Sequence, residues 1–209
     1  MLNIINQLET STPFTFGGFS ELHNIDGKIV KVLDDGCWSD TIVETVMQKQ
    51  AADAGLAPQV HGVSELDGSV IVIMDPVADG MVNVESEEDD GCIPTLLGDL
   101  DLCDALEGLT LYARLIAAGI VHADFHTGNW FMNAKRQTQA IDFGISSRLV
   151  DAPEKHLKRA IQTMLPVLEA AGYNALGRLL RFSWEMNDAD EMRAAVEVAA
   201  LEFLQDQDA

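Results

Sequence analysis

Basic residues are scarce in this chain of 209 residues, because 13 lysines and arginines stand against 34 aspartates and glutamates. The formal net charge is −21. A negative field of this size repels nucleic acid and anionic membrane surfaces, so we expect neither as a partner. It would tolerate or attract a basic partner, but it is more typical of a highly soluble acidic cytoplasmic protein without a specific partner. No apolar run approaches the ~20 residues of a transmembrane helix, and the first residues lack the basic and apolar segments of a secretory signal.

Cysteine is also rare. The three cysteines, Cys37, Cys92 and Cys103, are widely spaced, and no C-x-x-C occurs. An odd number without close pairs argues against a disulfide framework and favours a reducing compartment, the cytoplasm. With 47% hydrophobic residues, the chain can bury one sizeable core or two small lobes that share a cleft.

The most informative stretch is a polar cluster that begins at His122 and ends at Asp142. Short apolar runs flank it at residues 119–121 and 130–132 and at Ile141. This layout predicts a strand, a polar loop, a strand, a turn and a strand, with Asp124, Asn129 and Asp142 gathered at one edge. Carboxylate and amide oxygens are suitable ligands for Mg²⁺. A spare carboxylate beside a metal–phosphate site can accept a proton.

In these residues the chain resembles the protein-kinase-like superfamily. His122, Asp124 and Asn129 fit the catalytic-loop pattern H-x-D-x-x-x-x-N, and a D-F-G motif, residues 142–144, begins thirteen residues after Asn129. The resemblance implies ATP and Mg²⁺ as cofactors, with Asn129 and Asp142 as metal ligands and Asp124 as the proton acceptor. It also implies an α+β, bilobal fold with a small antiparallel-sheet N-lobe and a truncated helical C-lobe.

Upstream, an Asp-Gly turn at residues 26–27 separates two strand-like runs, residues 19–25 and 28–33, which is a strong hairpin signal. Gly17 and Gly18 precede it and allow close approach of the backbone to phosphates. The resemblance makes them the glycine-rich loop, although only two glycines of G-x-G-x-x-G are present. It places Lys31 at the α- and β-phosphates.

A helix is predicted over residues 40–54, ended by glycine and proline. Glu44 is the expected ion-pair partner of Lys31. The alternative is that Thr41 and Glu44 form a capping box at the helix start. Asp53, near the other end of the helix, is the second candidate partner for Lys31.

Two further strands are predicted at residues 59–63 and 69–74. The resemblance places the adenine-binding hinge just after them. Met74 would lie at the back of the adenine pocket, with the backbone of Asp75 and Val77 offering hydrogen bonds. The alternative for Met74 is a place in the strand core.

We predict a single domain over residues 1–209, with an N-lobe over about 1–78, an acidic linker over about 79–95 and a C-lobe over about 96–209. The acidic run 85–90 suits either a solvated loop or a landing surface for a basic substrate. Apolar spacing predicts a helix over 97–118. After Gly144 only 65 residues follow, and they predict helices over 153–171, 173–186 and 189–204 without an A-P-E motif.

His126 lies two residues after Asp124, where protein Ser/Thr kinases usually have lysine. The loop is similar to those of aminoglycoside and choline kinases and of ubiquinone-biosynthesis kinase-like ATPases, whereas the short chain is similar to RIO-type kinases. We expect a compact atypical protein Ser/Thr kinase that acts on another protein, preferably a basic one, or on itself. The alternatives are a kinase or ATPase for a small-molecule acceptor, and a non-catalytic nucleotide-binding regulatory module.

Overall fold

The computed structural model describes residues 2–8, 10–16, 20–33, 38–83 and 96–207. The first part of the chain forms α1 (Leu2–Leu8), β1 (Thr15–Phe16), β2 (Ser20–Ile25), β3 (Lys28–Leu33), α2 (Trp38–Asp53), β4 (Val60–Leu66), β5 (Ser69–Met74) and β6 (Val82–Asn83). The second part forms η1 (Leu97–Asp99), α3 (Leu102–Ala117), β7 (Ile120–His122), η2 (Thr127–Asn129), β8 (Trp130–Met132), β9 (Thr138–Ala140), η3 (Phe143–Ile145), β10 (Ser146–Arg148), η4 (Leu149–Asp151), α4 (Glu154–Ala170), α5 (Asn174–Met186) and α6 (Ala189–Gln207).

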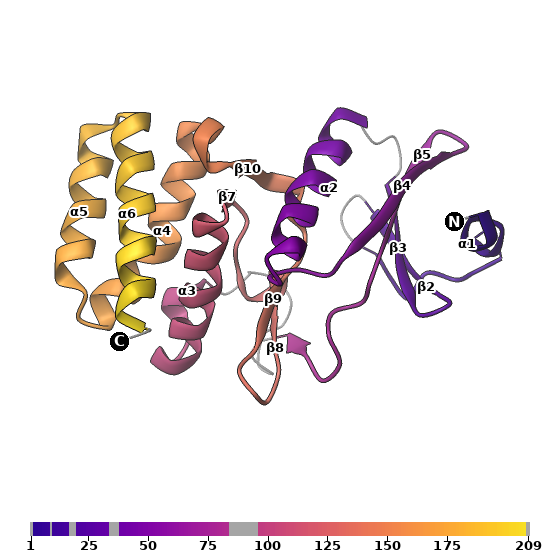
Figure 1. Cartoon of the computed structure of the whole chain (residues 1–209), viewed down its shortest axis with the longest axis horizontal. Coiled ribbons are helices and arrows are strands. Elements are labelled where there is room, and N and C mark those ends of the chain that lie inside the picture. The colour runs from indigo at the N-terminus through magenta and orange to yellow at the C-terminus, as the bar shows by residue number, and fades with distance from the viewer. Residues whose placement is uncertain (1, 9, 17–19, 34–37, 84–95, 208–209) are drawn as a thin grey trace.

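The N-terminal half is a five-stranded antiparallel sheet in the order β1-β2-β3-β5-β4. Helix α2 lies against the face toward the rest of the molecule, and α1 lies against the other face (Figure 1). The small core under α1 consists of Ile25, Val30, Ile71 and Ile73. Because side chains alternate along a strand, Lys31 points to the opposite face from Val30, toward α2. The sequence did not predict α1.

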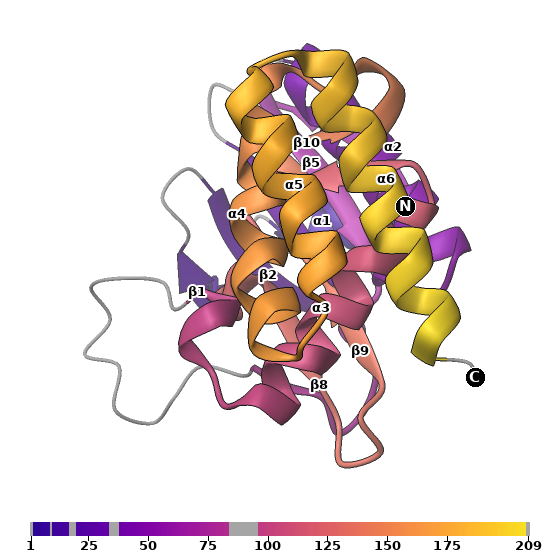
Figure 2. The same cartoon turned by 90° about the vertical axis from the view of Figure 1, so that its left-hand side faces the viewer.

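The C-terminal half is built from α3, α4, α5 and α6, which pack side by side (Figures 1 and 2). The predictions for α4, α5 and α6 agree with the structure to within three residues at each end. The predicted start of the preceding helix was wrong. Leu97–Asp99 forms a separate 3₁₀ turn, and α3 begins at Leu102 because the Asp101 carboxylate caps it, accepting the N–H groups of Cys103 and Asp104 at 2.9 and 3.1 Å.

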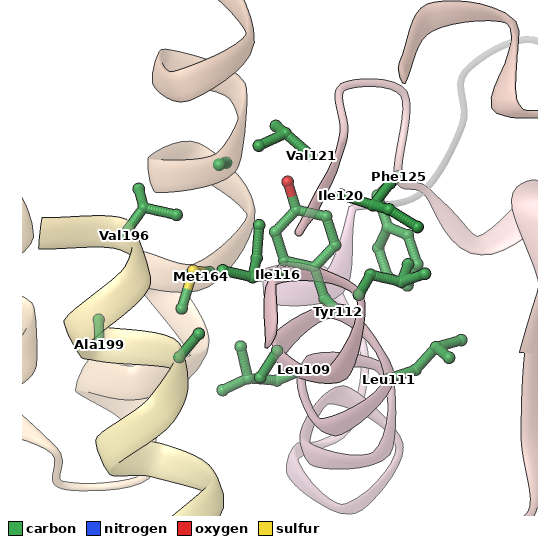
Figure 3. Close-up of a cluster of buried hydrophobic side chains, with 14 of the residues drawn as sticks. Leu109, Leu111, Tyr112, Ile116, Ile120, Val121, Phe125, Met164, Val196 and Ala199 are labelled. Atoms are coloured by element: carbon green, nitrogen blue, oxygen red, sulfur yellow. The ribbon is translucent and has the colours of Figure 1, made fainter. Parts of the chain in front are cut away.

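The main hydrophobic core reaches from the helices to the polar loop that follows β7 (Figure 3). Tyr112 on α3 is fully buried, and its ring centroid lies 4.8 Å from that of Phe125 in the loop. Phe125 in turn stacks on Trp130 at 6.3 Å. The phenol of Tyr112 donates a hydrogen bond to the His122 carbonyl at 3.2 Å. The helical half therefore fixes both ends of the loop.

The predicted mixed α+β architecture is confirmed, with an antiparallel sheet first and helices after it. Strand β6 continues the chain away from the sheet and pairs with β8, beside the polar loop. Among the described cysteines, Cys103 carries a free, exposed thiol, whereas Cys37 and Cys92 lie outside the described residues. None of the helices in the described part of the chain is long and apolar enough to cross a bilayer.

Candidate active site

Three charged side chains from distant parts of the sequence meet where α2 packs against η3. The Lys31 ammonium donates to Glu44 Oε1 at 2.6 Å and lies 3.4 Å from Asp142 Oδ1. The Lys31 and Glu44 side chains are 12% and 9% exposed, so this is a nearly buried ion pair. The expected pairing of Lys31 with Glu44 is thus present.

The two alternatives for this helix are wrong. Helix α2 begins at Trp38, so Thr41 lies inside the helix rather than at its cap, and Glu44 turns to Lys31 instead of closing the helix start. Asp53 pairs with Lys49 at 3.1 Å at the far end of α2.

The electrostatics favour a charged lysine at this position. Burial alone opposes the charged form of Lys31, but the nearby carboxylates of Asp142 and Glu44 outweigh that effect and raise the pKa of Lys31 above its ordinary value. The ammonium is therefore a fixed positive charge held between two carboxylates.

Asp142 has an unusual backbone conformation. Its φ and ψ angles are 55° and 71°, in the left-handed region that residues other than glycine rarely adopt. Such conformations persist where the surrounding structure holds them, and they are concentrated at functional sites. The carboxylate stays 52% exposed. Asp142 can therefore offer oxygen ligands to a group that enters from solvent.

The polar loop holds Asp124, His126 and Asn129 together by short-range contacts. The Asn129 amide nitrogen donates to the Asp124 carbonyl at 2.9 Å and lies 3.5 Å from the Asp124 carboxylate. It also lies 3.1 Å from His126 Nε2. The Asp124 side chain is 47% exposed, which leaves its carboxylate open to a substrate hydroxyl.

His122 joins the polar loop to the D-F-G segment. It is fully buried, and its Nε2 donates to the Ile141 carbonyl at 2.9 Å. The Ile141 N–H donates to the Asn129 carbonyl at 2.9 Å, so the residue before Asp142 is hydrogen-bonded to both ends of the loop. Burial lowers the pKa of His122. A neutral, buried imidazole that holds this hydrogen bond braces the loop rather than donating a proton to a substrate at neutral pH.

The predicted hinge residues follow β5. The hydrogen bonds of Asp75 show which of its backbone groups is already paired within the protein. The Asp75 N–H donates to the Gln59 carbonyl at 2.8 Å, which leaves the Asp75 carbonyl as the backbone group for a ligand. The Asp75 carboxylate accepts from Lys28 at 2.5 Å and lies 2.8 Å from His61 Nε2. Hydrogen bonds from these two side chains lower the pKa of Asp75.

Met74 is half-buried at the end of β5 and lies opposite Ile29 in the sheet. The buried Gln48 amide of α2 lies 3.3 Å from the Met74 sulfur and donates to the Pro58 carbonyl at 3.3 Å. Helix α2 therefore holds Met74 as well as Lys31. Sequence reasoning missed Gln48, because a glutamine inside a helix carries no signal of its long-range partner.

Part of the predicted site falls outside the described residues. Gly17, Gly18 and the acidic run 85–90 lie outside the described residues, and the binding roles given to Lys31, Met74, Asp75 and Val77 stay predictions. Within the described ranges, no group of three His, Cys, Asp or Glu side chains could hold a metal ion by itself. Asn129 and Asp142 would suit Mg²⁺ only together with phosphate oxygens and water, which is how proteins commonly bind that ion.

Comparison with known proteins supports the same interpretation of the loop. The family model of the ABC1 atypical kinase-like domain matches residues 105–169, which run from α3 through Asp124, Asn129 and Asp142 into α4. No curated protein matches the chain. Among solved structures, the Cydia pomonella granulovirus kinase PK-1 has 14% identity and a TM-score of 0.49. The match covers 76% of this chain and 66% of that chain, slightly under two thirds.

The resemblance found in the sequence is thereby confirmed at the level of the superfamily. Residues 105–169, which hold the catalytic-loop and D-F-G motifs, are similar to the ABC1 atypical kinase-like domain.

Proposed function

We propose that this protein is an ATP- and Mg²⁺-dependent phosphotransferase, and specifically a compact atypical protein Ser/Thr kinase that modifies another protein or itself. The observation that carries the proposal is the contact of Lys31 with both Glu44 and Asp142. It joins a strand, a helix and the D-F-G segment into one charged site. Phosphoryl transfer depends mainly on such positioning and charge neutralisation.

Each residue has a distinct role in this proposal. Lys31, held by Glu44, binds the nucleotide phosphates. Asp142 and Asn129 hold the divalent cation, which when bound neutralises charge on the phosphates. Asp124 accepts the proton of the attacking hydroxyl through its exposed carboxylate. His122 keeps the loop and the D-F-G segment in register through the Ile141 carbonyl.

The surface charge supports a protein acceptor of basic character. A molecule with a net charge of −21 attracts cationic substrates over long distances and repels anionic ones. After η3 the described chain forms β10, η4 and the packed helices α4, α5 and α6. Large side chains of these three helices, such as Leu157, Leu180 and Phe203, are buried in the core that the helices share.

A second candidate is a kinase or ATPase for a small-molecule acceptor. The observation that favours it is His126, which occupies the place where protein Ser/Thr kinases usually have lysine. A protein that binds ATP and Mg²⁺ without turnover is the third candidate.

One set of measurements separates these candidates. Wild-type protein, Asp124→Ala, Asp142→Ala and the control Asp53→Ala are incubated with ATP and Mg²⁺, with and without a basic protein substrate. Phosphoserine and phosphothreonine are mapped by mass spectrometry, and phosphate release is measured alongside. We expect label with the wild type and with Asp53→Ala, whose carboxylate is paired on the far end of α2, and none with the other two.

The contrary outcomes are equally clear. Equal label with Asp124→Ala overturns the kinase assignment. ATP turnover without protein label, stimulated by small alcohols or aminoglycosides, favours the second candidate. Thermal stabilisation by ATP–Mg²⁺ without any phosphate release favours the third.

A further inference from the structure

The outer end of the helical half carries exposed apolar side chains. Helices α5 and α6 lie side by side and form this end of the molecule, which faces the viewer in Figure 2. On both helices, exposed or half-buried apolar residues recur at the spacing that places them in one stripe. The stripe on α5 consists of Ala175, Leu179, Phe182 and Met186, and the stripe on α6 consists of Ala194, Val198 and Leu201.

The two stripes lean toward one another and form a continuous surface, which we call the α5/α6 face. Arg181 marks the side of α5 toward α4, because it pairs with Glu169 at 2.6 Å. The apolar stripe of α5 lies on the other side, toward α6. Arg193 marks the inner side of α6, because it donates to the Leu149 carbonyl at 3.0 Å. The apolar stripe of α6 lies on the outer side, toward α5.

Large residues on one helix of this face lie level with small residues on the other. Only two residues separate α5 from α6, so the helices run antiparallel away from a common turn. Phe182 lies four residues before the end of α5, and Ala194 lies five residues after the start of α6. Ala175 and Leu201 are likewise 11 and 12 residues from these ends. At ~1.5 Å per residue, the members of each pair lie at nearly the same height.

The charges of the face follow the same pattern. Helix α5 carries two arginines and one glutamate, whereas α6 carries five acidic residues and one arginine. Arg178 and Glu197 are exposed, form no ion pair with any described residue, and each lie eight residues from the turn. Arg178 is one turn from Arg181, and Glu197 is one turn from Arg193, so each lies at the edge of the face away from the other helix.

We propose that the α5/α6 face is the contact surface of a symmetric dimer, in which α5 of one copy packs on α6 of the other. A two-fold axis parallel to the helices leaves all heights unchanged and places each α5 over the α6 of the second copy. Three pairs then meet across the axis: Phe182 with Ala194, Ala175 with Leu201, and Arg178 with Glu197.

A second copy is the favoured occupant, because this one surface supplies both members of each large–small pair and of the charge pair. An arrangement that places α5 on α5 would bring the two acidic α6 helices together, so the charges favour α5 on α6. The dimer does not depend on the proposed phosphotransferase activity.

Sedimentation equilibrium of the 209-residue chain tests the proposal. At about 0.15 M salt, charges more than about 8 Å apart are largely screened, so the net charge opposes association only weakly. We expect a monomer–dimer equilibrium for the wild type. Phe182→Asp should raise the dimer Kd on the order of 100-fold, because the symmetric interface buries this ring twice.

Phe14→Asp is the matched control for Phe182→Asp. Both rings are 59% exposed in the single chain, but Phe14 precedes β2 in the N-terminal half. The control should leave the dimer Kd unchanged, and circular dichroism checks that both variants are folded. Equal weakening by the two substitutions, or none by Phe182→Asp, overturns the assignment of the face.

A charge exchange tests the placement of α5 on α6. Arg178→Glu and Glu197→Arg should each weaken the dimer on the order of 10-fold, because like charges then face each other at both symmetric positions. The double variant Arg178→Glu/Glu197→Arg should return to within about threefold of the wild type. A double variant no tighter than the single ones overturns this placement. A wild type that stays monomeric at millimolar concentration overturns the dimer and leaves the face to a different protein.

Discussion

The two polar networks of the site are built in opposite ways. The contacts of Lys31 reach 13 residues along the chain to Glu44 and 111 residues to Asp142, and they join full charges. The contacts among Asp124, His126 and Asn129 span at most five residues of one loop and rest on hydrogen bonds to amide and carbonyl groups. The local network depends on its own loop, whereas the charged network depends on how the sheet, α2 and the D-F-G segment are placed.

Among the proposed substitutions, removal of Lys31 should cause the largest loss in the free energy of unfolding. In Lys31→Met the Glu44 carboxylate, whose residue is 7% exposed, loses its partner inside the protein. A buried charge left without its partner costs about 3–5 kcal/mol. In Lys31→Met/Glu44→Leu the unpaired charge is gone, and most of that free energy of unfolding returns. Urea unfolding at pH 7 measures both changes, and neither protein should bind the nucleotide through this site.

Lys49→Met is the matched control. Lys49 and Asp53 form an ion pair on the same helix, but both side chains are 59% exposed. Its loss should change the free energy of unfolding by no more than about 1 kcal/mol, because exposed pairs contribute little. If Lys31→Met costs no more than Lys49→Met, burial does not distinguish the two pairs and the charged network has no special dependence on the fold.

The same contrast explains what the sequence could predict. The loop network follows from spacing within eight residues, so the motif alone brought Asp124 and Asn129 together. Helices α4, α5 and α6 follow from apolar periodicity. Helix α1 escaped prediction because it is only seven residues long and is held by Ile4 and Leu8 against a sheet formed later in the chain.

The contacts that depend on the register of the sheet could not be predicted from the sequence either. Lys28, His61 and Asp75 meet because β3 and β4 flank β5 and because the pairing of β4 shifts between Val60 and Gly62. No local pattern encodes that shift. The pairing of Lys31 with Glu44 was predicted only because the resemblance supplied the long-range partner.

His122 links the two networks, and acidification tests its contribution to stability. We expect this effect to be smaller than that of removing Lys31. Burial lowers the pKa of His122, so unfolding exposes a group that binds a proton more readily than it does in the folded state. Its contribution to stability is fully present above the unfolded pKa of about 6.5 and is lost as pH falls below it, at up to about 1.4 kcal/mol per pH unit.

His122→Gln isolates this contribution. Glutamine keeps a donor for the Ile141 carbonyl but does not titrate, so the stability difference between wild type and variant should shrink between pH 7.5 and 5.5. His156, whose pKa is also lowered by burial and by Lys155, is present in both proteins and cancels. Parallel stability curves measured by urea unfolding at each pH contradict the prediction.

The smallest expected effect concerns the glycine of the D-F-G segment. A Cβ on Gly144 would lie 3.4 Å from Asp142 Oδ1 and 3.7 Å from Glu44 Oε2, which are ordinary contacts. Gly144→Ala should therefore shift the free energy of unfolding by less than about 1 kcal/mol. In Gly108→Ala the Cβ would lie 2.5 Å from Leu97 Cδ2 and 3.0 Å from the Trp130 ring, and such overpacking costs about 1–3 kcal/mol. If thermal unfolding shows Gly144→Ala to be the more damaging change, the carboxylates of the charged network are held more rigidly than the core beneath the loop.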